Sequence, residues 1–481
     1  MPTRRQFLAA GAGVAAATAG LGALASNRSR GHGPNVLVVM IDTLRADHAY
    51  GPGARTPAID ALMSEGLRFD RAYPEAMPTV PVRNGLLTGR RMFPFRDWED
   101  ERGLLNRPGW SSLGDPSRTF TSALRRAGWW TAYVTDNPFL GFSQPYESLR
   151  RSFDLFIRRG GQIGGRSDGV PPELLAHWLH PATMRDSGAV ERVTRYIANS
   201  NYSKDENESF AARVFGSGIE ALDRGIERQP FALVVDTFHP HEPWTPPTSY
   251  LELNGHAADI GPEPAMPRYA RVENWLTEEE AGPVLDRMRA LYAAEVSMTD
   301  RWLGALIERL HDHGVEHETV IAMAGDHGFQ LGERGWTGKI SSALHPELIQ
   351  VPLILVDPER RRAGESSAYF ASTHDLARTL LRMAGVRPPP GTNGVDLSGF
   401  FDGREPPERP FAYGGYSNNH FLRKERWAYM SDNRLESPQL YDLESDPGEV
   451  VNVAETYPDV VEELSDAVRR RAGGGLPYYD S

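Results

Sequence analysis

Short apolar runs that recur along the chain constrain the fold most. Residues 36–41 form a continuous run rich in β-branched side chains, which is typical of a strand buried on both faces of a parallel sheet. Four similar runs follow, at residues 130–134, 231–235, 319–323 and 352–356. Helix-like segments precede three of these runs, at residues 122–127, 211–227 and 300–313. The alternation predicts an α/β fold, a doubly wound and mostly parallel sheet with helices on both faces.

The length of 481 residues suggests more than one domain. We expect the main α/β domain at residues 34–365, with a Gly-, Ser- and Arg-rich insertion at 141–209 and a Pro-rich excursion at 257–283. Residues 366–481 read as a smaller α+β domain. Its expected elements are helices at 376–384 and 460–471 and strands at 426–430 and 439–442.

The N-terminus is predicted to be an export signal. Arg4 and Arg5 precede a mildly apolar Ala- and Gly-rich stretch, and small residues allow cleavage after Ala25. The stretch is short and broken by glycines, which disfavours a membrane-spanning helix. Residues 1–25 resemble a twin-arginine signal, and residues 26–33 are expected to be a polar linker. The Tat export machinery would then deliver a folded protein to the periplasm, the cell surface or the medium.

The charge and the absence of cysteine exclude several functions. A net charge of -12 argues against a scaffold that binds nucleic acid through bulk electrostatics, so an acidic substrate needs a local basic site. With no cysteine, the chain has no disulfides, thiolate metal sites, cysteine nucleophiles or cofactors made from cysteine. Only three of the 52 basic residues are lysines, which makes each lysine notable.

Candidate metal ligands follow two of the predicted strands. Asp42 comes after the first strand, and Asp326 and His327 come after the run at 319–323. Ligands in open α/β sheets collect at the carboxyl ends of strands, so these side chains can converge on one divalent ion. Taken singly, each residue also fits a helix cap or a turn. The ligand types suit Ca, Mg, Mn or Zn about equally. Asp236, His239 and His345 are further candidates for a second ion.

Residues 79–90 carry the most specific motif. The stretch reads Thr-Val-Pro-Val-Arg-Asn-Gly-Leu-Leu-Thr-Gly-Arg. It resembles the sulfatase signature Cys/Ser-x-Pro-x-Arg-x-x-x-Leu-Thr-Gly-Arg at every fixed position except the first. Further matches stand in order at 34–47, 56–60, 239–244, 326–333, 338–339, 351–353 and 440–447. The chain therefore resembles the sulfatase family of the alkaline phosphatase superfamily over nearly all of its mature length.

The resemblance implies roles for the catalytic residues. Thr79 stands at the nucleophile position, as a fourth metal ligand at a helix N-terminus that favours an anion. Arg83, one turn further on, is implied to bind the transferring group and to orient the nucleophile. His241 corresponds to the family histidine that can protonate the leaving oxygen, and Lys339 to the lysine that acts from the other side.

Three departures from the family pattern bear on the substrate. Thr79 cannot be oxidised to the formylglycine aldehyde that sulfatases make from cysteine or serine, so no formylglycine is expected. This favours phosphorus esters, as in the threonine-nucleophile members of the superfamily. Asn137 stands in Thr-Asp-Asn-Pro where many sulfatases carry Gly-Lys-x-His, and it resembles the substrate-contacting asparagine of phosphonate monoester hydrolases. Thr43 replaces an acid or amide and is a weak ligand or none.

The leading hypothesis is an exported, metal-dependent hydrolase of anionic esters, with phosphate mono- and diesters favoured over sulfates. The substrate would be a small molecule or a glycan or lipid ester. Three alternatives stay open: a true sulfatase with an unusual nucleophile, a phosphoryl transferase to a glycan or lipid, and a non-catalytic binder of anionic polymers.

Overall fold

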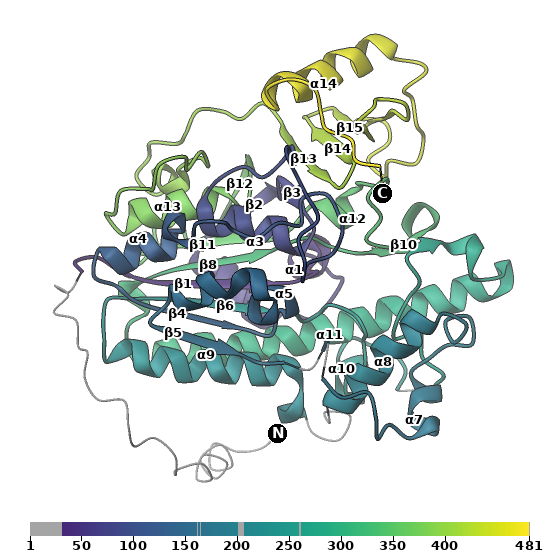
Figure 1. The fold of residues 1–481 in the computed structure, drawn as a ribbon, viewed down its shortest axis with the longest axis horizontal. Helices are drawn as coiled ribbons and strands as arrows, with labels where there is room; N and C mark the ends of the chain where they lie inside the picture. Colours follow the sequence, from purple (N-terminus) through teal and green to yellow (C-terminus); the bar gives the residue numbers. More distant parts are fainter. Residues whose placement is uncertain (1–30, 161, 164, 201–205, 259–260, 481) are drawn as a thin grey trace.

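A large twisted sheet forms the centre of the protein (Figure 1). The computed structural model describes residues 31–480 except 161, 164, 201–205 and 259–260. The predicted signal peptide and most of the predicted linker lie outside the described residues. The sheet has eight strands in the order β12-β2-β11-β8-β1-β6-β4-β5. Strands β8, β1, β6, β4 and β5 run parallel to one another, whereas β11 is antiparallel to both β8 and β2. The predicted mostly parallel α/β sheet is confirmed.

All five strands that were expected in the large sheet are present. They are β1 (Asn35–Ile41), β4 (Trp130–Thr135), β6 (Phe231–Thr237), β8 (Thr319–Gly325) and β11 (Leu353–Val356). Three further strands of this sheet were not predicted, β2 (Leu67–Ala72), β5 (Leu155–Arg158) and β12 (Glu365–Ala371). These three contain partly exposed or exposed residues, so they lack the continuous apolar pattern by which a central strand is recognised.

Strand β1 shows how the sheet divides two cores. Leu37, Val39 and Ile41 pack into the core that includes helices α2 (Pro57–Glu65), α9 (Phe210–Ile226) and α11 (Glu278–Asp312). The alternate residues Val36 and Val38 pack into the opposite core with α3 (Thr79–Thr88), α4 (Phe120–Arg126) and α13 (Asp375–Met383). In Figure 1, α9 and α11 lie below the sheet and α4 and α13 above it. Helices therefore cover both faces, as expected.

Helix α11 is longer than predicted. The sequence analysis expected a helix from residue 300 and a Pro-rich excursion up to 283, but the helix begins at Glu278. A capping box between Thr277 and Glu280 starts it. Pro283 lies near this start, where a missing N–H removes only one hydrogen bond of a 35-residue helix.

The segment 141–209 contributes to the sheet and also covers its carboxyl end. It contains the edge strand β5 and the helices α7 (Pro172–His177) and α8 (Ser187–Asn199). Tyr196 on α8 contacts His239 in the loop after β6, with 3.2 Å between the phenol oxygen and Nε2. The segment is thus tied to the main domain next to the functional loops.

A second sheet joins the C-terminal part of the chain to the signature segment. Its five strands are β3 (Ala76–Met77), β13 (Ala412–Tyr416), β14 (Asn419–Arg423), β15 (Trp427–Asp432) and β16 (Gln439–Asp442). Helix α14 (Pro458–Arg471) packs near them (Figure 1). The boundary predicted after residue 365 needs correction, because β12 pairs with β2 and keeps the large sheet running to Ala371.

The remaining elements are short. A three-stranded sheet contains β7 (Ala270–Arg271), β10 (Trp336–Gly338) and β9 (Gln330–Leu331). The other helices are α1 (Ala46–Ala49), α5 (Pro138–Phe142), α6 (Glu147–Arg151), α10 (Thr248–Leu253) and α12 (Pro346–Ile349). Within the described residues, no helix combines the length and apolar character needed to cross a membrane.

Candidate metal centre and anion site

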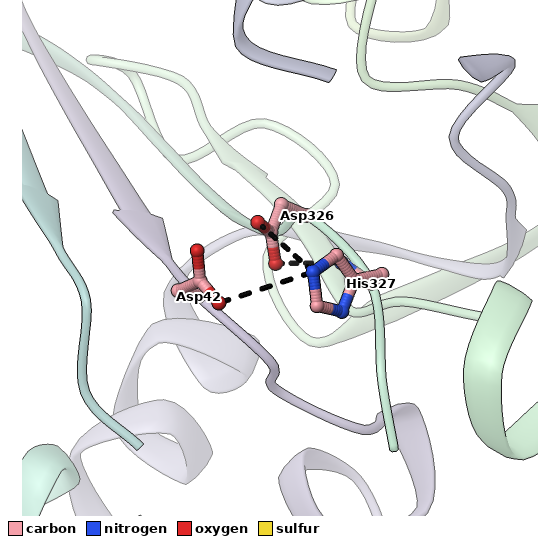
Figure 2. A group of neighbouring side chains, drawn as sticks. All are labelled: Asp42, Asp326 and His327. Carbon is pink, nitrogen blue, oxygen red and sulfur yellow. Dashed lines mark hydrogen bonds and ion pairs between the residues drawn. The ribbon is translucent and has the colours of Figure 1, made fainter. Parts of the chain in front are cut away.

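Two carboxylates and one imidazole meet at the carboxyl ends of β1 and β8 (Figure 2). Asp42 follows β1 directly, and Asp326 and His327 follow β8. The two strands are paired, with Ile41 opposite Gly325, so their ends lie side by side. The three side chains are fully buried, and one ligand atom from each lies within 4.8 Å of the others. The structure brings together all three residues that the sequence analysis named as strand-end ligands.

The donor atoms are oriented for a divalent cation. His327 donates from Nδ1 to the Gly328 carbonyl at 2.9 Å, which leaves the Nε2 lone pair facing the carboxylates. Nε2 lies 3.6 Å from Asp326 and 3.9 Å from Asp42. His327 Nε2 is buried and has no hydrogen-bond partner among the described residues, and the buried Asp42 Oδ2 has only its ion pair with Arg83 at 3.1 Å. Burial lowers the pKa of His327 to about 4, so the ring is neutral as ligation requires. The residues present fit the divalent metal that the resemblance implies.

Thr43 holds both carboxylates in place. Its backbone N–H donates to Asp326 at 2.8 Å and its hydroxyl donates to Asp42 at 2.6 Å. The residue has a φ of 59°, a left-handed conformation that costs a β-branched residue about 1–3 kcal/mol. The sequence analysis left Thr43 as a weak ligand or none. In the structure its hydroxyl is a donor that orients Asp42.

Arg83 lies beneath the ligands and neutralises part of their charge. Its fully buried guanidinium contacts three carboxylates, at 3.1 Å from Asp42, 2.7 Å from Asp236 and 2.5 Å from Asp326. One guanidinium therefore faces three buried acidic groups, more than it can neutralise alone. Burial and the charge of Asp326 raise the pKa of Asp42 well above its ordinary value. A bound divalent cation would restore the balance.

Removal of Arg83 is expected to destabilise the fold. In Arg83→Met the three carboxylates lose their shared partner, which should lower the free energy of unfolding by about 3–5 kcal/mol. Urea denaturation of the variant and the parent protein, both in a chelator, measures this loss. A difference below about 1 kcal/mol, the size of an exposed ion pair, would show that the guanidinium is not needed to hold the carboxylates.

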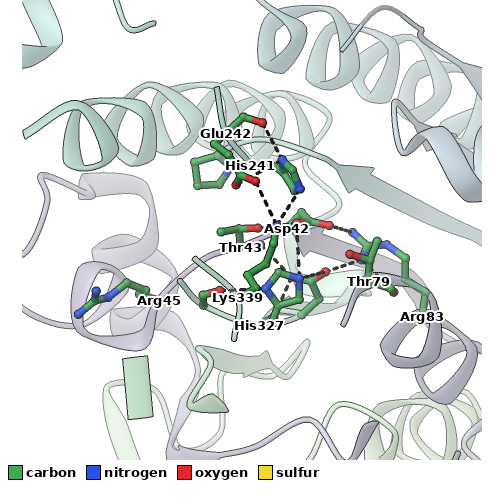
Figure 3. A network of polar contacts seen from close by, with 12 residues as sticks. Asp42, Thr43, Arg45, Thr79, Arg83, His241, Glu242, His327 and Lys339 are labelled. Carbon is green, nitrogen blue, oxygen red and sulfur yellow. Dashed lines mark hydrogen bonds and ion pairs between the residues drawn. The ribbon is translucent and has the colours of Figure 1, made fainter. Parts of the chain in front are cut away.

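Thr79 is the first residue of α3 and lies next to Arg83 (Figure 3). The residue is 4% exposed, and Arg83 Nη1 donates to its carbonyl at 3.2 Å. Strand β3 of the smaller sheet ends at Met77, just before the helix. The preceding residue, Pro78, offers no side chain that caps the first N–H groups. The start of α3 can therefore receive an anion through its backbone donors.

Lys339 and His241 form a hydrogen-bonded pair on the other side of the ligand cluster (Figure 3). Lys339 Nζ lies 2.8 Å from His241 Nε2. His241 Nδ1 lies 2.7 Å from the Glu242 carbonyl oxygen, to which it donates, so Nε2 accepts from the lysine. Burial and the charge of Lys339 lower the pKa of His241 well below its ordinary value. In this arrangement the ammonium group of Lys339 carries the proton.

The other candidates have contacts of their own. Asn137 accepts hydrogen bonds from the backbone of Phe139 and Leu140 and so caps α5, while its buried Nδ2 lacks a partner among the described residues. Asp236 contacts Arg83 and accepts from the Tyr133 hydroxyl at 2.8 Å. His239 meets Tyr196 and lies 3.4 Å from Glu295, and His345 pairs with Glu449 at 2.8 Å. Asp236, His239 and His345, the candidates for a second ion, therefore do not form a metal site together.

The sequence analysis missed two parts of the site. It considered Asp236 only as a metal ligand, although its position at the end of β6 places it beside the signature arginine. It also passed over Glu242, whose carboxylate lies 3.5 Å from Lys339 Nζ. Glu242 could have been recognised from its position directly after His241, the histidine that matches the family motif.

Comparison with known proteins identifies the family. The model of the family described as Sulfatase matches residues 34–386, which is most of the chain. The chain belongs to the sulfatase family. A second model, described as N-sulphoglucosamine sulphohydrolase, C-terminal, matches residues 332–472. The resemblance seen in the signature segment is confirmed.

Curated relatives of this sulfatase-family chain cover most of its length. An arylsulfatase of Clostridium perfringens is 24% identical over 90% of this chain and 92% of its own length. A choline-sulfatase of Rhizobium meliloti is 26% identical over 88% of this chain and 82% of its own length. A phosphonate monoester hydrolase from Silicibacter pomeroyi shares the fold, with a TM-score of 0.69, 19% identity and coverage of 91% of this chain and 95% of its own. Family and relatives identify an ester-cleaving hydrolase.

Proposed function

We propose that this protein is an exported, metal-dependent hydrolase that cleaves phosphate or phosphonate esters through Thr79. The observation that carries the proposal is the position of Thr79, a buried threonine at the uncapped start of α3, where the family signature places the residue that is oxidised in sulfatases. The motif at residues 4–5 supports export by the Tat pathway to the periplasm, the cell surface or the medium.

The proposed metal site uses Asp42, Asp326 and His327, with Thr79 as the fourth ligand and Ca, Mg, Mn or Zn as candidate ions. When bound, the cation would supply positive charge that lowers the pKa of the attacking hydroxyl and stabilises the transferring anion. Arg83 keeps the carboxylate ligands in position through its contacts with Asp42 and Asp326.

The first proposed chemical step transfers the acidic group to Thr79. The Oγ atom attacks phosphorus and gives its proton to solvent, the bond from phosphorus to the leaving oxygen breaks, and that oxygen takes a proton from Lys339, which recovers one from solvent. His241 accepts from Lys339 Nζ at 2.8 Å and so directs its proton. Asn137 offers an unpaired amide for an oxygen of the substrate. Water then attacks the phosphorus of the ester on Thr79, which releases the acid and restores the hydroxyl.

The threonine favours phosphorus over sulfur for a chemical reason. A formylglycine hydrate expels sulfate by collapsing to an aldehyde, a path that a threonine ester lacks. The ester on Thr79 has to be cleaved at phosphorus or sulfur itself. A true sulfatase remains the main alternative. Two relatives are named as an arylsulfatase and a choline-sulfatase, and one similar structure contains a disulfated glucosamine as its substrate. A non-catalytic binder is less favoured, since the proposed ligands Asp42, Asp326 and His327 lie together and Lys339 pairs with His241. A transferase to a glycan or lipid stays an alternative.

A substrate panel tests the proposal. The mature chain is reconstituted with each of the four ions and assayed on four 4-nitrophenyl esters. These are the sulfate, the phosphate monoester, a phosphate diester and the phenylphosphonate. We expect kcat/KM for the best phosphorus ester to exceed that for the sulfate by about tenfold or more, a difference of about 1.4 kcal/mol in transition-state binding. A preference for the sulfate would support the true sulfatase, and the absence of turnover with every ion would support the binder.

A further inference from the structure

Glu242 is buried beside the acid–base pair but is absent from the chemistry described so far. Its side chain is 1% exposed, and Oε1 lies 3.5 Å from Lys339 Nζ. Oε2 lies 3.4 Å from His241 Nδ1 and has no hydrogen-bond partner among the described residues. A buried carboxylate in such a place costs free energy unless a cation compensates it. Lys339 is that cation.

The ion pair is held apart rather than closed. Tyr269 donates a hydrogen bond from its hydroxyl to Glu242 Oε1, the oxygen that faces the lysine. This hydrogen bond partly neutralises the negative charge on Glu242 Oε1, which weakens the attraction between that oxygen and Lys339. The ammonium instead makes its shorter contact with His241, at 2.8 Å.

The surroundings of Lys339 restrict its position further. Its side chain is 6% exposed, and Nζ lies 5.5 Å from the centre of the Tyr269 ring and 5.7 Å from that of Phe329. The His241 ring stacks on Phe238, with centroids 4.1 Å apart. Each partner of the ammonium is thus in contact with a neighbour that restrains it, and Figure 3 shows Glu242, His241 and Lys339 close together.

We propose that Glu242, restrained by Tyr269, is a positioning residue that holds the protonated Lys339 in line with the leaving oxygen. The inference rests on the proposed function, in which Lys339 protonates that oxygen. Glu242 would stabilise the ammonium in its buried position while competing with the bound anion for it. Removal of the Glu242 charge should therefore strengthen anion binding but slow the protonation of a poor leaving group.

The test uses the metal-loaded variant Glu242→Gln, which keeps the shape of the side chain and removes its charge. Without the competing carboxylate, orthophosphate should bind roughly three- to tenfold more tightly in isothermal titration. The ethyl ester of phenylphosphonate, whose leaving oxygen needs a proton, should lose about ten- to hundredfold in kcat relative to the 4-nitrophenyl ester, whose leaving group does not. A merely structural defect would weaken binding and slow both esters together.

Two further variants guard the interpretation. In Tyr269→Phe, Glu242 Oε1 loses its hydrogen bond and should attract Lys339 more strongly. Orthophosphate binding should then weaken, and kcat should again fall more for the ethyl ester than for the 4-nitrophenyl ester. Glu263→Gln removes another buried carboxylate, paired with Arg287 at 2.6 Å, and should change neither measurement. Equal slowing of both esters, or weaker orthophosphate binding in Glu242→Gln, overturns the inference. If the parent protein cleaves no ester, the proposed function fails, but the orthophosphate measurements still test Glu242.

Discussion

Thr79→Ala is expected to abolish turnover of every ester while leaving the metal content nearly unchanged. The variant loses the proposed nucleophilic oxygen, and loss of a nucleophile lowers kcat by a factor on the order of 10³ or more. Asp42, Asp326 and His327 remain, and the ion should remain with them. Steady-state kinetics and elemental analysis on the same preparation check both parts.

Two substitutions at the same position sharpen this result. Thr79→Ser keeps the oxygen and loses only the methyl that restricts its rotamer, so part of the phosphoester activity should survive. Thr79→Cys, produced with a formylglycine-generating enzyme, should shift preference from phosphate toward sulfate esters. A quenched reaction of the parent protein should show a phosphoryl group on the peptide that contains Thr79. Full activity in Thr79→Ala would instead leave the metal to activate water directly.

Five strands of the central sheet were predictable because they are buried on both faces. Strand β1 alternates between two cores, Leu37 toward one and Val36 toward the other, so both sets of side chains are apolar and the run is continuous. Strand β12 was not recognised because its first five residues are exposed or half-buried, and only its last two are buried. Without an apolar pattern it was assigned to the wrong side of a domain boundary. The start of α11 was missed since Pro283 and Gly282 read as loop residues.

The candidate site divides in the same way. Asp42 and Asp326 were predictable from sheet topology, because adjacent parallel strands must present their ends together. The contacts of Arg83 were not predictable. Its position one turn after Thr79 shows which face of the helix it lies on, but not which residues it contacts. Its contact with Asp236 depends on how α3 is laid across the sheet, which involves residues 153 positions apart in the sequence. The restraint on Lys339 is likewise set by Tyr269 and Glu242, which lie on separate loops of the fold.

Asp326→Ala is expected to empty the metal site and abolish activity. The carboxylate is the most connected ligand, because it accepts from the backbone of Thr43 and His327 and pairs with Arg83. Its loss removes one of the two carboxylate ligands and releases the loop that positions the other. Metal content should fall from roughly one ion per chain to near zero, since one of the two anionic ligands is lost and the other is no longer held in place.

The control for Asp326→Ala has to separate metal loss from general damage to a buried ion pair. Asp375→Asn serves this purpose, because Asp375 is also fully buried and pairs with Arg409 at 2.9 Å, away from the ligand cluster. That variant should keep its metal even where its thermal midpoint falls. Asp326→Asn adds a graded test, because it keeps one oxygen acceptor and should retain weak metal binding that excess ion can saturate. If Asp326→Ala kept both its metal and its activity, the ion would have to be bound elsewhere and the strand-end site would lose its role.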